Sequence, residues 1–90
     1  MKYQIKGRRV TPANPSRQLS AIRNLDAAEF DHIIGVLFDA EFTVAGAYKV
    51  PHSVVREYAK YRKHTNAYIL HLQGRLLSDP RVTDISVELR

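Results

Sequence analysis

The sequence predicts an α+β domain with a mixed central sheet, a core antiparallel hairpin and one or two flanking helices. Two mostly apolar runs, residues 30–39 and 42–50, follow each other closely and predict the hairpin. The alternating segment at residues 2–10 predicts a further strand, and apolar residues at helical spacing predict the helices. A chain of 90 residues has the size of one domain. We therefore expect residues 1–90 to form a single domain, or a fragment of a longer one.

The first strand is expected at residues 2–10. Because side chains alternate across a strand, Gln4 and Lys6 share one face, and Tyr3 and Ile5 share the other. We expect the apolar face to pack against the hairpin, which would bury Ile5 and leave Lys6 exposed. A basic strand of this kind is also typical of a sheet edge, where charges discourage pairing with other chains.

A stiff loop and a short helix are expected to follow the first strand. Two prolines within residues 11–15 disfavour both a strand ladder and a regular helix. Ser16 is a good N-cap residue, and Leu19, Ile22 and Leu25 then recur at helical spacing. The spacing predicts a helix that buries these three side chains.

The hairpin is the predicted core of the domain. Residues 30–39 are expected to form a buried strand and residues 42–50 its antiparallel partner, with a tight connection at residues 40–41. The run at residues 33–38 is apolar nearly throughout. This composition predicts that both faces of the strand are covered.

A second helix is expected from Ser53, a good N-cap residue, to about Tyr61. On such a helix Arg56, Lys60 and Lys63 recur at steps of four and three and share one face. The spacing predicts a basic stripe that faces solvent.

The C-terminal part has a weaker pattern. Within residues 66–72, Tyr68, Leu70 and Leu72 would lie on one side of a strand and Ile69 and His71 on the other, and Gly74 is expected to break this strand. Ser78 or Asp79 is expected to cap a further helix. The tail after it is typical of either a short helix or a last strand.

Positive charge is concentrated at the N-terminal end of the chain. The formal net charge is +5, and no acidic residue precedes Asp26. A basic region of this kind is the electrostatic footprint of a nucleic-acid-binding protein. The cations of this region are Lys2, Lys6, Arg8, Arg9, Arg17 and Arg23.

Several function classes lack their motifs in this sequence. There is no cysteine, which excludes disulfides and cysteine-ligated zinc. The four histidines lack the spacing of a helical zinc site, and neither a glycine-rich phosphate loop nor a hydrolase nucleophile elbow occurs. The longest apolar stretch is far shorter than the ~20 residues that span a bilayer, and the N-terminus does not resemble a signal peptide. We therefore expect a cytoplasmic protein without a membrane segment.

Four segments carry a resemblance to a known superfamily. The segments YQIKGRR (3–9), PSRQLSAIR (15–23), FDHIIGVLFD (30–39) and KVPHSVVRE (49–57) resemble the C-terminal portion of uncharacterised bacterial proteins similar to restriction-endonuclease-like domains, the PD-(D/E)XK superfamily. The resemblance spans nearly the whole chain. It implies that the sheet is half of a restriction-endonuclease-like fold and that the partner is DNA.

The resemblance also implies a catalytic site on the first strand. In this superfamily an Asp on one strand and an Asp or Glu on the next bind the metal, and a Lys two residues on helps to activate water. Gln4 would take the second acidic position and Lys6 the position of the lysine, with Mg²⁺ as the cofactor of a catalytic form. The strand with the first Asp would precede residue 1. Its absence leaves open a fragment, a reduced relative that does not cut, or an acid supplied by Asp31, Asp39 or another subunit.

We therefore expect a DNA-binding protein, with a complete catalytic site as the minority option. The alternative is a small interaction or dimerisation module, in which a second copy or a partner strand completes the sheet and the basic surface meets an acidic protein. The residues expected to contact nucleic acid are Arg8, Arg9, Ser16, Arg17, Arg23, Lys60 and Lys63.

Overall fold

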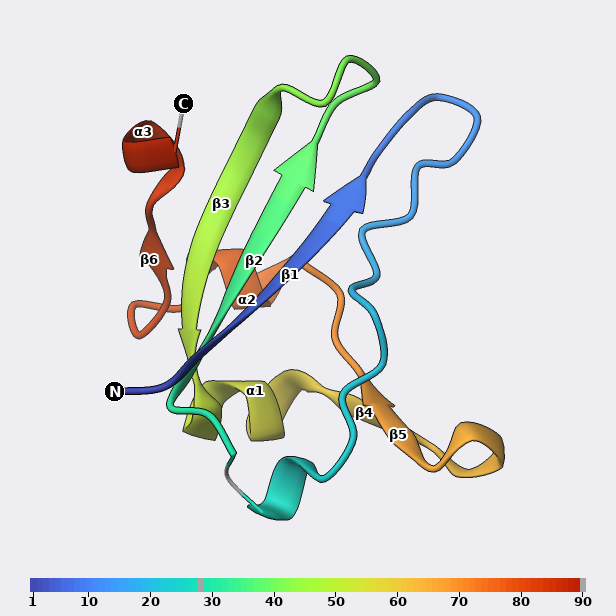
Figure 1. Cartoon of the computed structure of the whole chain (residues 1–90), viewed down its shortest axis with the longest axis vertical. Helices are drawn as coiled ribbons and strands as arrows, with labels where there is room; N and C mark the ends of the chain where they lie inside the picture. Colours follow the sequence, from blue (N-terminus) through green and yellow to red (C-terminus); the bar gives the residue numbers. More distant parts are fainter. Residues whose placement is uncertain (28, 90) are drawn as a thin grey trace.

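The computed structural model describes residues 1–27 and 29–89 and confirms the α+β class. A four-stranded mixed sheet in the order β1-β2-β3-β6 forms one layer, and a separate two-stranded sheet pairs β4 with β5. Figure 1 shows α2 behind the main sheet, α1 at its lower end and the small sheet at the lower right. The described elements are β1 (Tyr3–Arg9), the 3₁₀ turn η1 (Leu25–Ala27), β2 (His32–Phe38), β3 (Val44–Pro51), α1 (His52–Tyr58), β4 (Lys60–Arg62), the 3₁₀ turn η2 (Lys63–Thr65), β5 (Ala67–Ile69), α2 (Arg75–Ser78), β6 (Thr83–Asp84) and α3 (Ser86–Leu89).

The predicted hairpin is confirmed as the antiparallel pair of β2 and β3. Asp39 closes its turn, because the Asp39 carboxylate accepts hydrogen bonds from the backbone N–H groups of Glu41 (3.0 Å) and Thr43 (2.9 Å). β1 pairs with β2 in parallel, from Tyr3 opposite His32 to Arg9 opposite Phe38. In the order β1-β2-β3-β6, β1 is therefore one of the two edge strands of the main sheet.

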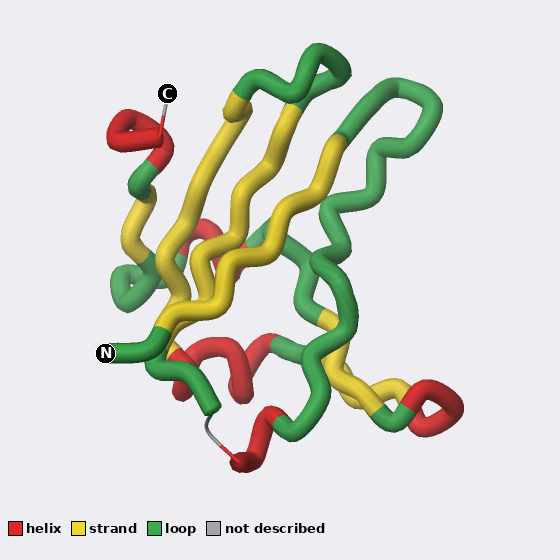
Figure 2. The backbone as a smooth tube through the Cα atoms, in the orientation of Figure 1, coloured by secondary structure: helices red, strands yellow, loops and turns green. Residues whose placement is uncertain are grey.

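The core lies between the inner face of the main sheet and the elements behind it (Figure 2). Ile33 and Val50 contribute fully buried side chains from the sheet, and Val54 and Val55 contribute them from α1. Burying such side chains supplies most of the favourable free energy of folding. The remaining core side chains are Leu19, Ile22, Leu25, Phe30, Leu37, Leu70, Leu72 and Leu76.

Gly35 allows the second layer to approach the sheet closely. A Cβ atom at this position would lie only 2.6 Å from Leu72 Cδ1, so a side chain cannot be added without moving Leu72. In the register of the sheet Gly35 is the partner of Lys6. The glycine thus brings the segment with Leu72 against the same part of the sheet as Lys6.

The faces of β1 are the reverse of the prediction. Ile5 is 74% exposed, whereas Gln4 and Lys6 are half-buried on the inner face. The inner side of this edge strand meets polar groups of the chain at Ser20 and Ala21, and a lysine can bury its aliphatic stem while its ammonium reaches such acceptors. Gln4 and Lys6 do share a face, as predicted.

The outer face of the main sheet is covered only in part. Val36 is buried there and α3 packs against β3, but Ile34 is half-buried and Tyr3 is 47% exposed. The expectation that both faces of the apolar run are covered therefore holds for only part of its length.

The prediction of a helix after Ser16 is wrong. The segment is extended instead, because the backbone N–H of Leu19 donates to Leu70 O (2.9 Å) and that of Ile22 donates to Tyr68 O (2.9 Å). Leu19 and Ile22 are nevertheless buried, as predicted. Pairing with a distant strand satisfies the backbone here in place of a local helix.

The second helix is present but shorter than predicted. α1 ends at Tyr58, and its N-cap is Pro51 without a capping side chain, so Ser53 does not cap it. Residues 60–62 form β4, which pairs with β5 in an antiparallel manner. The predicted stripe of Arg56, Lys60 and Lys63 on one helix is therefore wrong.

The tail of the chain contains both a short strand and a short helix, which the sequence offered as alternatives. The strand predicted at residues 66–72 is present as the shorter β5, and Gly74 breaks the chain with a φ of 64°. No described helix begins at Ser78 or Asp79: Ser78 ends α2, and Asp79 is its C-cap residue. The Asp79 carboxylate accepts hydrogen bonds from Arg81 N (2.9 Å) and the Arg81 guanidinium. β6 and the short α3 follow. No helix within the described residues is long and apolar enough to cross a membrane.

Candidate nucleic-acid interface

The two residues proposed as catalytic, Gln4 and Lys6, lie on the inner face of β1. The Lys6 ammonium donates hydrogen bonds to Ser20 Oγ (3.0 Å) and to Ala21 O (3.4 Å). Burial lowers the pKa of Lys6 below its ordinary value, because desolvation disfavours the charged form. The ammonium is thus directed at the chain that runs behind β1.

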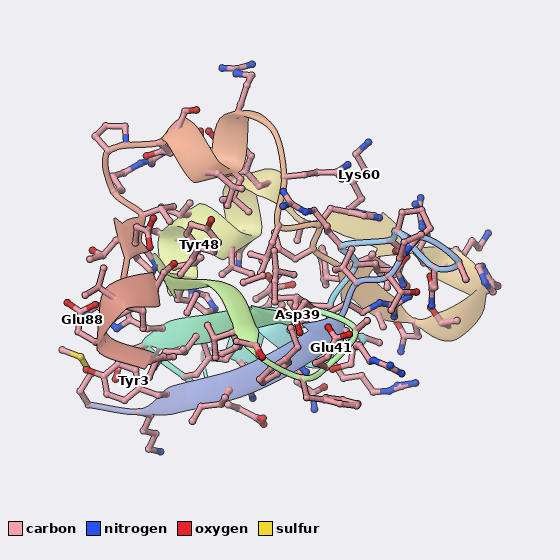
Figure 3. The ribbon with its side chains drawn as sticks, turned by 90° about the horizontal axis from the view of Figure 1, so that it is seen from above. Tyr3, Asp39, Glu41, Tyr48, Lys60 and Glu88 are labelled. Atoms are coloured by element: carbon pink, nitrogen blue, oxygen red, sulfur yellow. The ribbon has the colours of Figure 1, made fainter. Side chains whose placement is uncertain are left out.

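The carboxylates that were candidates for the missing acid are engaged elsewhere. Asp31 Oδ2 accepts a hydrogen bond from the backbone N–H of Lys2 (2.7 Å), and Asp39 closes the hairpin turn. Figure 3 shows Asp39 beside Glu41 at that turn. Across residues 1–27 and 29–89, no three His, Cys, Asp or Glu side chains group closely enough to hold a metal ion. A neutral Gln4 and a lysine do not fit Mg²⁺, which is bound through carboxylate oxygens.

The arginines of β1 contact their own protein. Arg8 lies on the inner face, where its Nη2 donates to Asn14 Oδ1 (3.5 Å) and its Nε is buried without a partner in the described structure. Arg9 donates to Ala40 O (3.1 Å from Nε) and lies over the Phe42 ring, 4.6 Å from its centroid. Both guanidiniums are therefore held against the sheet and the hairpin turn.

The other N-terminal candidates divide into two groups. Arg17 is half-buried and donates to Leu72 O (3.4 Å), and Ser16 Oγ accepts a hydrogen bond from Gln18 N (3.2 Å). Arg23 is exposed, and its side chain forms no hydrogen bond or ion pair among the residues described. Of this set, only Arg23 presents a free guanidinium to solvent.

A cluster of exposed cations lies on the hairpin formed by β4, η2 and β5, residues 60–69, which projects from the domain at the lower right of Figure 1. Lys60, Arg62 and Lys63 are exposed, and within the described chain their side chains have no hydrogen-bond or ion-pair partner. Figure 3 shows Lys60 on the opposite side of the molecule from β1 and Tyr3. The structure thus separates the basic residues of β1 from those of the hairpin.

Tyr61 occupies the other face of β4. It is 50% exposed, and its ring lies 5.3 Å from the ring of its cross-strand partner Tyr68, at an interplanar angle of 60°. Its hydroxyl donates a hydrogen bond of 2.8 Å to Asn66 Oδ1. This bond fixes the orientation of a large exposed ring on the face of β4 opposite to Lys60 and Arg62.

Tyr61 and Tyr68 form one wall of a hollow of about 290 Å³. Asn24 and Asn66 also line it, and both have left-handed backbone conformations, with φ values of 55° and 49°. Asp26 also lines the hollow, and its carboxylate forms a solvent-exposed ion pair with Arg56. The hollow therefore combines aromatic surface, amide groups and a carboxylate.

The residues expected to bind nucleic acid did not include Tyr61, Arg62, Asn66 or Asn24, although Tyr61 was considered as a residue that could stack on a base. Because the predicted helix extended to about Tyr61, the cross-strand pairing of Tyr61 with Tyr68 could not be predicted. A usable signal was present in the run KYRKH at residues 60–64, where an aromatic side chain alternates with cations.

The chain was also compared with known proteins. Neither a scan against protein-family models nor a search of curated proteins found a match to the chain.

Proposed function

We propose that this domain binds DNA through the hairpin at residues 60–69 together with Arg23, and that the chain does not cut DNA by itself. The observation that carries the proposal is the set of exposed cations Lys60, Arg62 and Lys63, none of which has an intramolecular partner within the described residues. A polyanion can therefore bind them without breaking an existing interaction.

Electrostatics supports a phosphate backbone as the partner. The formal net charge of +5 favours association with a polyanion, and unpaired Lys and Arg side chains release counterions from DNA when they neutralise phosphates. The resemblance of residues 3–57 to restriction-endonuclease-like domains supports DNA as that polyanion. The side-chain environment of Lys6 supports binding without cleavage, because within residues 1–27 and 29–89 its ammonium bonds to Ser20 and Ala21 and to no carboxylate.

The test is a salt titration of binding to a fluorescein-labelled DNA duplex by fluorescence anisotropy. Changing Lys60, Arg62 and Lys63 together to Gln is expected to weaken binding and to flatten the dependence of log affinity on log salt by about 0.9 for each phosphate that the variant no longer neutralises. The matched control changes Lys2, Arg9 and Lys49 to Gln, which removes the same charge from the main sheet. Equal losses of affinity in both variants would show that only net charge matters and would contradict the assignment of the hairpin.

A second assay addresses cleavage. Incubation of the protein with supercoiled plasmid and Mg²⁺ is expected to leave the plasmid intact. Nicking that disappears in Lys6→Ala would contradict the proposal and would mean that a carboxylate reaches Lys6 from elsewhere, with Asp31, Asp39 and a second subunit as the sources to test.

A specific observation also favours the alternative of an interaction module. Ile5 is 74% exposed on an edge strand, and in the described chain no strand pairs with the free edge of β1. Such an edge can accept a partner strand. Lys6, Arg8 and Arg9 make β1 basic, which disfavours pairing with a second copy and favours an acidic partner.

This alternative predicts binding of a synthetic extended peptide that alternates Glu and Val. Binding would appear as chemical-shift changes in the amides of residues 3–9, and Ile5→Lys would abolish it. Unchanged spectra at millimolar peptide would remove the alternative.

A further inference from the structure

Tyr61, Asn66 and Tyr68 of the proposed DNA-binding hairpin line the hollow, and we propose that it holds an unpaired base of single-stranded DNA. This inference rests on the proposed function, because the phosphates would be held by the hairpin cations and Arg23. It goes further by assigning a preferred form of DNA and a base-binding position.

The first step of the argument is the aromatic surface. Tyr61 is 50% exposed, and its contact with Tyr68 is tilted at 60° rather than stacked face to face, which leaves ring surface available. Every nucleobase has a π face, so a base can stack on such a ring whatever its sequence. The hydrogen bond to Asn66 holds the ring in place before a base arrives.

The second step is the polar lining. Asn66 Oδ1 is used by the Tyr61 hydroxyl, which leaves the two N–H donors of its amide for a ligand. Asn24 contributes a second amide to the lining, and its side chain forms no hydrogen bond within the described residues. These amides and the Asp26 carboxylate provide donors and acceptors for the edge of a base, which becomes available only when the base is unpaired.

The third step is size and location. A volume of about 290 Å³ is just below the roughly 300–1,000 Å³ typical of small-molecule sites, which suits one planar ring system. Arg23 precedes Asn24 in the chain, and Lys63 begins the turn that leads to Asn66. In the proposal, the exposed side chains of Arg23 and Lys63 hold the phosphates that flank the base.

The experiment compares a labelled single strand of mixed sequence with the duplex of the same length, by fluorescence anisotropy at fixed salt. The protein is expected to bind the single strand more tightly than the duplex. Tyr61→Ala is expected to weaken single-strand binding by about 5- to 150-fold, the range for loss of one base–aromatic stack, and to leave duplex binding within about twofold. Tyr61→Phe keeps the ring and should retain the preference for the single strand.

Tyr3→Ala is the matched control, because Tyr3 is 47% exposed and lies on the main sheet. It should change neither affinity. A duplex that binds as tightly as the single strand, or equal losses in Tyr61→Ala for both, would overturn the base-binding proposal and leave the proposed function standing. Absence of binding to either DNA would overturn the proposed function itself.

A measurement on the unmodified protein removes dependence on the folding of the variant. Photo-cross-linking to a single strand that contains 5-iodouracil, followed by mass spectrometry, is expected to label the peptide with Tyr61. Labelling of the peptide with Tyr3 and not of the peptide with Tyr61 would contradict the assignment.

Discussion

The hydroxyl of Tyr61 donates a hydrogen bond of 2.8 Å to Oδ1 of Asn66, across the turn that joins β4 to β5. Asn66 can make this contact because its backbone has left-handed geometry, with a φ of 49°, and closes the turn through its N–H bond to Lys63 O (3.2 Å). Asparagine tolerates this conformation better than most residues with a Cβ atom. One residue thus shapes the turn and positions the exposed ring.

The turn can be tested by changing Asn66 in two ways. Asn66→Gly and Asn66→Ala both remove the hydrogen bond to Tyr61, but only the alanine places a side chain without local hydrogen bonds at positive φ. We expect the alanine variant to be less stable than the glycine variant by about 1 kcal/mol in urea unfolding. Equal stabilities would mean that the turn relaxes to a different conformation.

A change of isoleucine to alanine is expected to have very different effects on stability on the two faces of the main sheet. Ile5→Ala is expected to alter the free energy of unfolding by less than about 0.5 kcal/mol, because Ile5 is exposed. Ile33→Ala is expected to destabilise by about 2–5 kcal/mol, because Ile33 is fully buried. Chemical denaturation of both variants measures the difference. A loss at Ile5 as large as that at Ile33 would indicate that the outer face is covered in solution.

The close approach at Gly35 predicts a coupled pair. Gly35→Ala is expected to destabilise by about 1–3 kcal/mol, since the new Cβ would lie 2.6 Å from Leu72 Cδ1 and force the buried Leu72 side chain to shift. In the background of Leu72→Ala the same change should be smaller, because the opposing methyl groups are gone. A double-mutant cycle should give a coupling of about 0.5–3 kcal/mol, and strict additivity would argue against the contact.

The hydrogen bonds of Asp79 predict a pH dependence of stability. The Arg81 side chain and its backbone N–H, with the Tyr58 hydroxyl, hold the pKa of Asp79 well below its usual range. A carboxyl whose folded pKa lies below its unfolded value adds stability above the unfolded pKa, and this contribution is lost as the pH falls through the folded pKa. The unfolding midpoint of Asp79→Asn should therefore lie below that of the unmodified protein at pH 7.

The matching measurement is a series of urea titrations from pH 7 to pH 2. The two midpoints should approach each other below about pH 4, where an unfolded aspartate begins to bind a proton. A gap that is constant across this range would mean that the charge of Asp79 contributes nothing.

Local patterns predicted the fold class and the central hairpin, because apolar runs separated by a short turn specify an antiparallel pair without reference to the rest of the chain. They were wrong about the segment after Ser16. Leu19, Ile22 and Leu25 are spaced as on a helix, but their burial is achieved by an extended chain paired with residues near Leu70. Long-range pairing of this kind leaves no local signature.

The candidate site was predicted less well than the fold. The alternation on β1 correctly placed Gln4 and Lys6 on one face, but periodicity alone cannot show which face meets the core. In the structure the face with Lys6 turns inward, where its ammonium donates to Ser20 Oγ. Lys60 and Lys63 were correctly predicted as exposed cations, but they were placed on a helix. In the structure that helix, α1, ends at Tyr58, and both residues lie on the hairpin that follows it. A basic sequence shows that cations are present, but their availability depends on which of them find partners in the fold.

The most direct test of where DNA binds is a map of amide chemical shifts on titration of a short DNA strand into the isotope-labelled protein. We predict that the largest changes occur at residues 60–66 and 23–26, and that they disappear when Lys60, Arg62 and Lys63 are changed to Gln. Changes concentrated on β1 at residues 3–9, with the hairpin unaffected, would contradict the account.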